Sequence, residues 1–189
     1  MGGVPVIALA YHVDYWNYLG WRDPFSAKQW TTRQRAYASA VAGGRVYTPQ
    51  LIINGRGHAV GSQRRQVAAK VRALASTSAI NLQASLTRKA GRVRVVVRVP
   101  RAVRRSGVEL TVALYENDIR TRVPRGENAG RSLRNDHIVR ALKRGPAKAK
   151  REFTFTVRPG WVAKNLGAVA FLRDAKTLAV LATVRAKTR

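Results

Sequence analysis

The side chains best suited to chemistry in this chain gather in residues 12–25, which are rich in aromatic and polar groups. His12 and Asp14 are two positions apart, so on an extended backbone they point to the same face. One metal ion could use both, but the chain has three histidines and no cysteine, which leaves few further ligands. We therefore predict a hydrogen-bonded His12–Asp14 pair that braces a strand end, and no metal site. A pair that lines a cleft, and a hydrolase that uses both residues, stay open as alternatives.

The same stretch carries a dense group of aromatic residues. Trp16, Tyr18 and Trp21 are followed by Trp30 and Tyr37 at helical spacing. Exposed aromatic rings can stack on sugars, bases or peptides. Packing against the helix that carries Trp30 is the favoured interpretation.

Composition excludes several kinds of chemistry. With no cysteine, the chain itself forms no disulfide or thiolate metal site and performs no thiol catalysis. No apolar run reaches the roughly 18 residues of a membrane span, and nothing near residue 1 has the pattern of a signal peptide. The chain as written is expected to stay in the cytoplasm, and no cofactor is expected.

The charge is strongly positive and uneven. The 36 Lys and Arg residues against 9 Asp and Glu residues give +27. Residues 1–79 hold 10 basic and 2 acidic residues, a net +8, and residues 80–189 hold 26 and 7, a net +19. Such a field attracts nucleic acid or other polyanions at low salt. The alternative is a bias toward arginine on solvated faces.

The first half of the chain predicts strands and helices in alternation. Residues 4–13 are almost continuously apolar, which is typical of a strand covered on both faces. Ser26 and Gln29 have the spacing of a capping box for a helix that ends at Gly43. Residues 51–53 and 58–60 predict a hairpin around Asn54-Gly55, and Ser62 is the expected cap of a second helix.

From residue 80 the pattern changes to a period of two. Valines 93, 95, 97 and 99 alternate with arginines 92, 94 and 98, which predicts a half-buried strand with an arginine face. Strands are expected at 80–86, 93–99, 108–114, 138–142, 152–157, 168–172 and 178–184. About seven short strands favour an antiparallel β-sandwich. The polar bridge near residues 75–80 places the domain boundary, giving domains 1–78 and 79–189.

A polar cluster precedes the expected strand at 138–142. Its members, which supply Asx-turn residues and opposite charges, are Glu127, Asn128, Arg131, Asp136, His137 and Arg140. A structural loop with local ion pairs is favoured over a catalytic site.

Several motifs resemble a known family. They are HVDYW at 12–16, LGW at 19–21, DPF at 23–25, RQRAY at 33–37, VYTPQ at 46–50, RGENAGR at 125–131 and HIVR at 137–140. The chain is similar to the bacterial secreted thioredoxin-like family called domain of unknown function 1223. This resemblance implies an α+β protein with a thioredoxin-like layer and a cis-proline loop at Thr48-Pro49. Members usually carry an earlier strand and a Cys-x-x-Cys segment, so we expect that this chain represents an N-terminally truncated layer.

The resemblance also points to a cleft. In the family fold the cis-proline loop faces the redox site, and an extended peptide could pair with the backbone of Thr48. The candidate cleft residues are His12, Asp14, Tyr15, Trp16, Trp21, Asp23, Thr48, Pro49 and Gln50.

These observations predict a binding or structural module with no catalytic residue assigned. Two alternatives are a fragment of a periplasmic thiol–disulfide oxidoreductase-like protein whose redox motif and signal peptide lie upstream, and a basic nucleic-acid-binding protein. With a first strand missing, residues 4–13 would have an unpaired edge, so we expect low solubility or a dimer.

Overall fold

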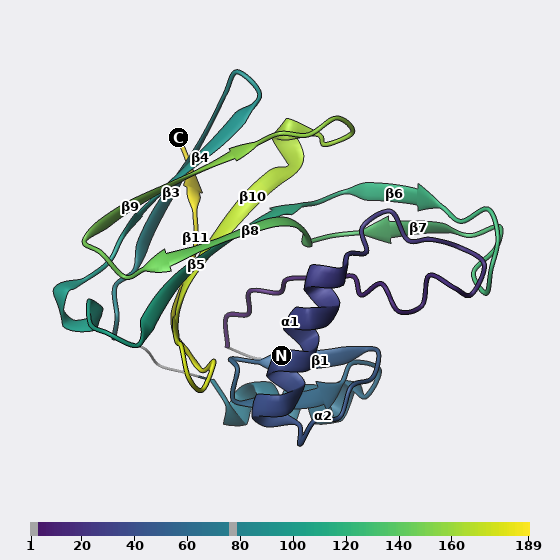
Figure 1. Cartoon of the computed structure of the whole chain (residues 1–189), viewed down its shortest axis with the longest axis horizontal. Helices are drawn as coiled ribbons and strands as arrows, with labels where there is room; N and C mark the ends of the chain where they lie inside the picture. The colour runs from purple at the N-terminus through teal and green to yellow at the C-terminus, as the bar shows by residue number, and fades with distance from the viewer. Residues whose placement is uncertain (1–3, 76–78) are drawn as a thin grey trace.

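The computed structural model describes residues 4–75 and 79–189 (Figure 1). Within these residues the protein is a mixed α+β fold of two helices and twelve strands in four mostly antiparallel sheets. The expected linker near residues 75–80 falls partly on residues 76–78, which lie outside the described residues.

The first half contains two helices that flank a hairpin. In chain order these elements are α1 (Lys28–Val41), β1 (Gln50–Ile53), β2 (Gly57–Val60) and α2 (Arg64–Ala73). The turn is the predicted one, because Asn54 and Gly55 have φ values of 50° and 61°, as a type I′ turn requires. A Cβ at Gly55 would lie 2.1 Å from the carbonyl oxygen of Leu178, so only glycine allows this approach.

The prediction of a strand at residues 4–13 is wrong. The segment makes a single parallel bridge, in which Ala10 pairs with Ile138. Ala10 N–H donates to His137 O, and Val139 N–H donates to Ala10 O, each at 2.9 Å. The apolar residues Ile7, Leu9 and Tyr11 pack against a core cluster and leave the segment half-buried. The apolar run therefore serves packing on another sheet, and the unpaired edge that suggested a dimer does not form.

The predicted helix caps are also wrong in detail. Helix α1 has Ala27 at its N-cap and α2 has Gln63, and neither side chain caps its helix. The Ser26 hydroxyl instead donates to Asp23 O at 2.8 Å. The loop before α1 uses this serine for its own hydrogen bonds.

Most strands of the second half form two four-stranded sheets. One has the order β11-β10-β5-β8 and the other β12-β3-β4-β9. Their bounds are β3 (Gln83–Lys89), β4 (Arg92–Arg98), β5 (Val108–Glu116), β8 (Ile138–Pro146), β9 (Lys150–Thr156), β10 (Leu166–Asp174), β11 (Val180–Arg185) and β12 (Lys187–Thr188). Each of the seven predicted strands overlaps one of these, although β3 begins after Ile80 and Leu82.

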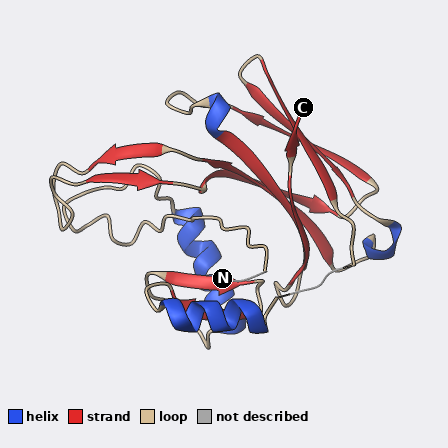
Figure 2. Ribbon diagram, turned by 180° about the vertical axis from the view of Figure 1, so that it is seen from behind, coloured by secondary structure: helices blue, strands red, loops and turns tan. Residues whose placement is uncertain are grey.

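The two sheets pack against each other (Figure 2). Side chains from both sheets form one hydrophobic core. Alternate residues of β4, including Val93, Val95 and Val97, are fully buried in it. Leu110 and Leu172 reach the same cluster from the opposite sheet. Burial of these side chains, each contributing about 1.5–3 kcal/mol, explains the period of two in the sequence.

The outer face of β5 and β10 is covered as well. Trp30 of α1 is 4% exposed and packs with Ala113, Tyr115 and Phe171. Figure 1 shows α1 running beside this sheet. As a result, β5 and β10 are buried on both faces along almost their whole length.

A two-stranded arm extends from β5 and β8 of the β11-β10-β5-β8 sheet. It consists of β6 (Ile119–Arg122) and β7 (Ser132–Asn135) and reaches over the aromatic loop, which is formed by residues 12–25 (Figure 1). A Cβ at Gly126 near its tip would lie 3.1 Å from Leu19 O and 3.3 Å from Trp21 Cβ. The polar cluster predicted as a loop therefore includes a β-arm that touches residues 19–21.

Neither helix in the described ranges is long and apolar enough to span a membrane.

Replacing Trp30 with alanine should lower the free energy of unfolding by about 3–5 kcal/mol, because the change leaves a cavity between α1 and the sheet. Urea denaturation followed by circular dichroism measures the loss. Tyr18→Ala is the control, since Tyr18 is 76% exposed and should change stability by about 0.5 kcal/mol or less. Equal losses for both variants would contradict the packing of Trp30 against the sheet.

Candidate functional site

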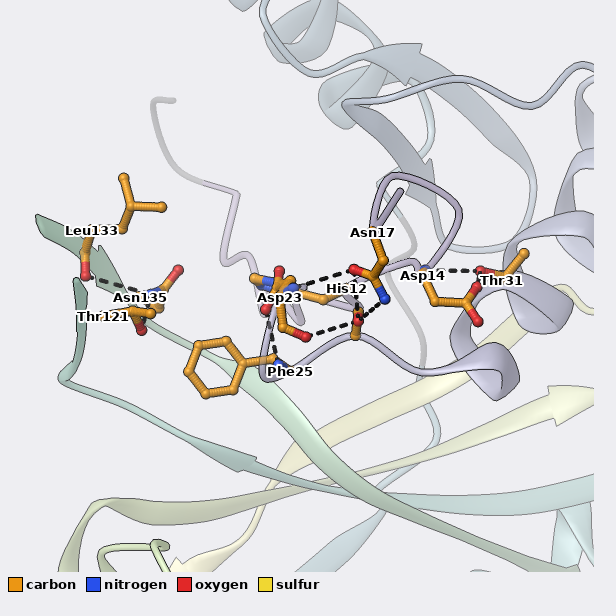
Figure 3. Close-up of polar contacts among 10 residues, drawn as sticks. His12, Asp14, Asn17, Asp23, Phe25, Thr31, Thr121, Leu133 and Asn135 are labelled. Atoms are coloured by element: carbon orange, nitrogen blue, oxygen red, sulfur yellow. Dashed lines mark hydrogen bonds and ion pairs between the residues drawn. The ribbon is translucent and has the colours of Figure 1, made fainter. Parts of the chain in front are cut away.

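Asp23 organises the loop of residues 12–25 (Figure 3). One carboxylate oxygen lies 2.5 Å from His12 Nδ1, and the other accepts the Phe25 N–H at 2.8 Å. The Asp23 N–H donates to Asn17 Oδ1 at 3.2 Å, and Asn17 Nδ2 donates to Ser26 Oγ at 2.9 Å. The loop is thus closed on itself by side chains before α1 begins.

The predicted His12–Asp14 pair is wrong. His12 pairs with Asp23, while Asp14 accepts the Thr31 hydroxyl at 2.5 Å (Figure 3). Because residues 4–13 do not form a strand, the same-face rule for residues two apart does not apply. His12 O also accepts the Ala27 N–H at 3.2 Å, which brings the two ends of the loop together.

A second network joins the loop to the proline turn through α1. The Tyr15 hydroxyl donates to Gln34 Oε1 at 3.0 Å. Gln34 Nε2 donates to Tyr47 O and to Gln50 Oε1, each at 2.9 Å. The single side chain of Gln34 therefore links Tyr15 to Gln50.

Trp16 contacts the turn directly. Its indole N–H donates to Thr48 Oγ1 at 3.0 Å, and its ring stacks on Tyr18 with centroids 6.5 Å apart. Trp16 is 46% and Tyr18 76% exposed. Packing therefore does not explain these two rings, whereas Trp21 is half-buried against the arm.

The Thr48–Pro49 peptide bond is cis, as the family resemblance implied. Thr48 and Pro49 are both exposed. Pro49 O accepts the Gly61 N–H at 2.8 Å. Within residues 4–75 and 79–189, neither the N–H nor the C=O of Thr48 has a hydrogen-bond partner.

Beside this turn, His58 lies on β2. Its Nδ1 is 2.6 Å from the Tyr47 hydroxyl, and its carbonyl accepts Lys70 Nζ at 2.6 Å. Burial lowers the pKa of His58 from its ordinary value, and the charges of Lys70 and Arg45 lower it further. The neutral imidazole is therefore favoured here.

The polar cluster of the sequence does not gather into one site. Glu127, Asn128 and Arg131 are exposed at the end of the arm. Asp136 accepts the Asp118 N–H at 2.9 Å, and the His137 N–H donates to Asn117 at 2.9 Å, both at the base of the arm. These two hydrogen bonds join the ends of the arm.

Arg140 takes part in an ion pair that the sequence did not reveal. Its Nε lies 3.1 Å from Glu116, whose side chain is 2% exposed. The guanidinium lies 5.2 Å from the Phe25 ring and 5.0 Å from that of Trp161. Burial lowers the pKa of Arg140, and Glu116 opposes that shift. An acid at the end of an otherwise apolar strand was the only signal for this pair.

Across the described residues, no three His, Asp or Glu side chains converge as metal ligands. The arrangement suits binding through exposed aromatic rings and backbone groups.

The class defined by these features is a mixed α+β protein with an exposed aromatic surface at a cis-proline turn. The chain belongs to the family described as "Protein of unknown function (DUF1223)", which matches residues 2–173. A comparison with curated proteins finds no match.

Two solved structures are similar in fold. One is protein AGR_C_4864 from Agrobacterium tumefaciens, with a TM-score of 0.67 and 24% identity over 95% of this chain and 79% of that one. The other is HBP35 of Porphyromonas gingivalis, with a TM-score of 0.57 and 12% identity over 85% and 60% of the two chains. At these identities the likeness concerns the fold alone.

Replacing Asp23 with alanine should destabilise the protein by about 1–3 kcal/mol, because His12, the Phe25 N–H and the loop closure lose their acceptor. Urea unfolding gives the magnitude, and limited proteolysis should show faster cleavage within residues 12–25. Glu127→Ala, at the exposed tip of the arm, is the control and should behave like the parent protein. If both variants match the parent, Asp23 does not organise the loop.

Proposed function

We propose that this protein is a non-catalytic binding module that captures an extended, acidic peptide segment. The binding site would be the Thr48 surface, defined as Trp16, Tyr18, Val46 and Thr48. The observation that carries the proposal is the exposed Thr48 backbone, which has no hydrogen-bond partner in the described ranges, next to two exposed aromatic rings.

The backbone and the rings suit the same ligand. An extended peptide can pair with one free N–H and C=O as a short added strand. Trp16 and Tyr18 offer rigid contact area beside that strand, and Val46 is 40% exposed two residues before Thr48. Because the indole N–H of Trp16 bonds Thr48, its ring is held in place before a ligand arrives.

The net positive charge of residues 1–79 favours an acidic partner. The two acidic residues in this range are both engaged, since Asp14 bonds Thr31 and Asp23 pairs with His12. Ten basic residues remain against them in residues 1–79. Opposite charge on the peptide would speed its encounter with this surface.

The proposal includes a fold assignment. We propose a thioredoxin-like layer for residues 1–78 and a β-sandwich for residues 79–189. The helix–hairpin–helix order and the cis-proline turn support the first, and the core common to two sheets supports the second. With no cysteine in the sequence, thiol–disulfide exchange by this chain is excluded.

An array of 12-residue peptides that vary in acidic and aromatic content should yield binders rich in Asp or Glu. On titration of the best peptide, NMR should show shifts of the Thr48 amide and the Trp16 indole N–H. Trp16→Ala and Tyr18→Ala should each weaken binding about tenfold, as expected of aromatic anchors.

Val162→Ala is the control, because Val162 is 45% exposed but belongs to the other half of the chain. Its affinity should equal that of the parent. An array without binders, or shifts confined to residues 79–189, would refute the proposal.

A second candidate function rests on the outer face of the β12-β3-β4-β9 sheet. The strand register places Arg92 beside Lys89 and Arg98 beside Lys150, all exposed. In the described part of the chain, the one ion pair on this face joins Arg94 to Glu152. A flat cationic face of this kind supports binding to the phosphates of nucleic acid.

If so, a fluorescent 20-nucleotide duplex should bind with an affinity that falls steeply with salt. Changing Arg92, Arg94 and Arg98 together to glutamine should reduce the slope of log K against log salt by up to about 3. The matched control changes Arg64, Arg65 and Arg72, exposed residues of α2, to glutamine. Equal slopes in the two triple variants would exclude this face as the binding surface.

A further inference from the structure

A pocket lies between α1 and the β11-β10-β5-β8 sheet. Its volume is about 550 Å³, and its wall combines side chains of α1 with Arg144 of β8 and Arg173 of β10. The α1 residues include Lys28, Arg33 and Tyr37. The volume is typical of sites for small molecules. The pocket shares no residue with the Thr48 surface.

The charge in this pocket is not balanced. Lys28, Arg33, Arg144 and Arg173 bring four positive charges. In the described ranges the one carboxylate paired with them is Glu109, which accepts from Arg173 Nε at 2.8 Å and lies 3.9 Å from Arg144 Nε. Helix α1 contains no acidic residue. Three positive charges therefore remain without a counter-charge.

Burial makes this excess costly. Arg173 is 7% exposed, and Arg33 Nη1 is buried without a hydrogen-bond partner among the described residues. The Arg33 guanidinium lies 4.9 Å from the Tyr11 and Tyr37 rings, which hold it without neutralising it. Burial lowers the pKa of Arg144, and the neighbouring charge of Arg173 lowers it further. An anion in the pocket would offset the repulsion between these neighbouring cations.

We propose that this pocket binds a small organic polyanion that carries two or more carboxylate or phosphate groups. The planar guanidinium of Arg144 can form two parallel hydrogen bonds with either group. The Tyr37 hydroxyl accepts from Arg33 Nη2 at 3.3 Å, so its own proton is free to donate to the ligand. Lys28 contributes a further cation at the first turn of α1.

Calorimetric titration of the full chain with citrate and with pyrophosphate, at an ionic strength held constant with sodium chloride, tests the proposal. We expect one site per chain for at least one of the two anions, and the preferred anion identifies the carboxylate or phosphate class. Lys28→Gln and Arg144→Gln should each weaken binding about tenfold, because each removes a charge-assisted contact. Arg173 is left intact, since it is buried and its ion pair with Glu109 belongs to the fold.

Arg35→Gln is the matched control. Arg35 lies on α1, is exposed and does not line the pocket, and the change removes the same charge. Its affinity should equal that of the parent. The proposal is overturned if neither anion binds beyond the effect of chloride, or if Arg35→Gln weakens binding as much as Arg144→Gln. Near-ultraviolet circular dichroism confirms that each variant is folded.

Discussion

The contact between α1 and the outer faces of β5 and β10 is the interaction on which the rest of the structure depends. Trp30 is almost fully buried there, against side chains of a sheet whose inner face already forms the main core. Two further contacts tie the halves together. Val180 N–H donates to Asn54 O at 2.8 Å, and Ala10 bridges to Ile138. The helix, the hairpin and the leading segment are therefore fixed against one sheet.

Once α1 is docked, its other side chains position the two proposed binding sites. Thr31 and Gln34 hold the aromatic loop and the proline turn, while Arg33 and Tyr37 reach the cationic pocket. The few carboxylates of the chain are mostly used in internal pairs, as Glu116 is with Arg140. Basic side chains therefore far outnumber carboxylates, and this excess is the reason for proposing anionic partners.

Much of the local structure could be predicted from the sequence. The Asn54-Gly55 turn follows from the backbone freedom of these two residues, and the alternation of Val93, Val95 and Val97 follows from a sheet with one buried face. The absence of cysteine and the net charge of +27 are properties of the sequence itself. Motif resemblance indicated the cis-proline turn and the family. These features depend on neighbours in sequence or on composition, so no tertiary contact was needed to find them.

Only the tertiary structure decided which distant residues meet. An apolar run at residues 4–13 reads equally well as a strand or as a packing segment, and its docking on β8 selected the second. His12 pairs with Asp23 rather than with its near neighbour, because the loop folds back before α1. The cationic pocket joins Arg33 to Arg173, which are 140 positions apart. Hydrophobic periodicity carries no information about such partners, since they are set by how α1 packs on the sheet.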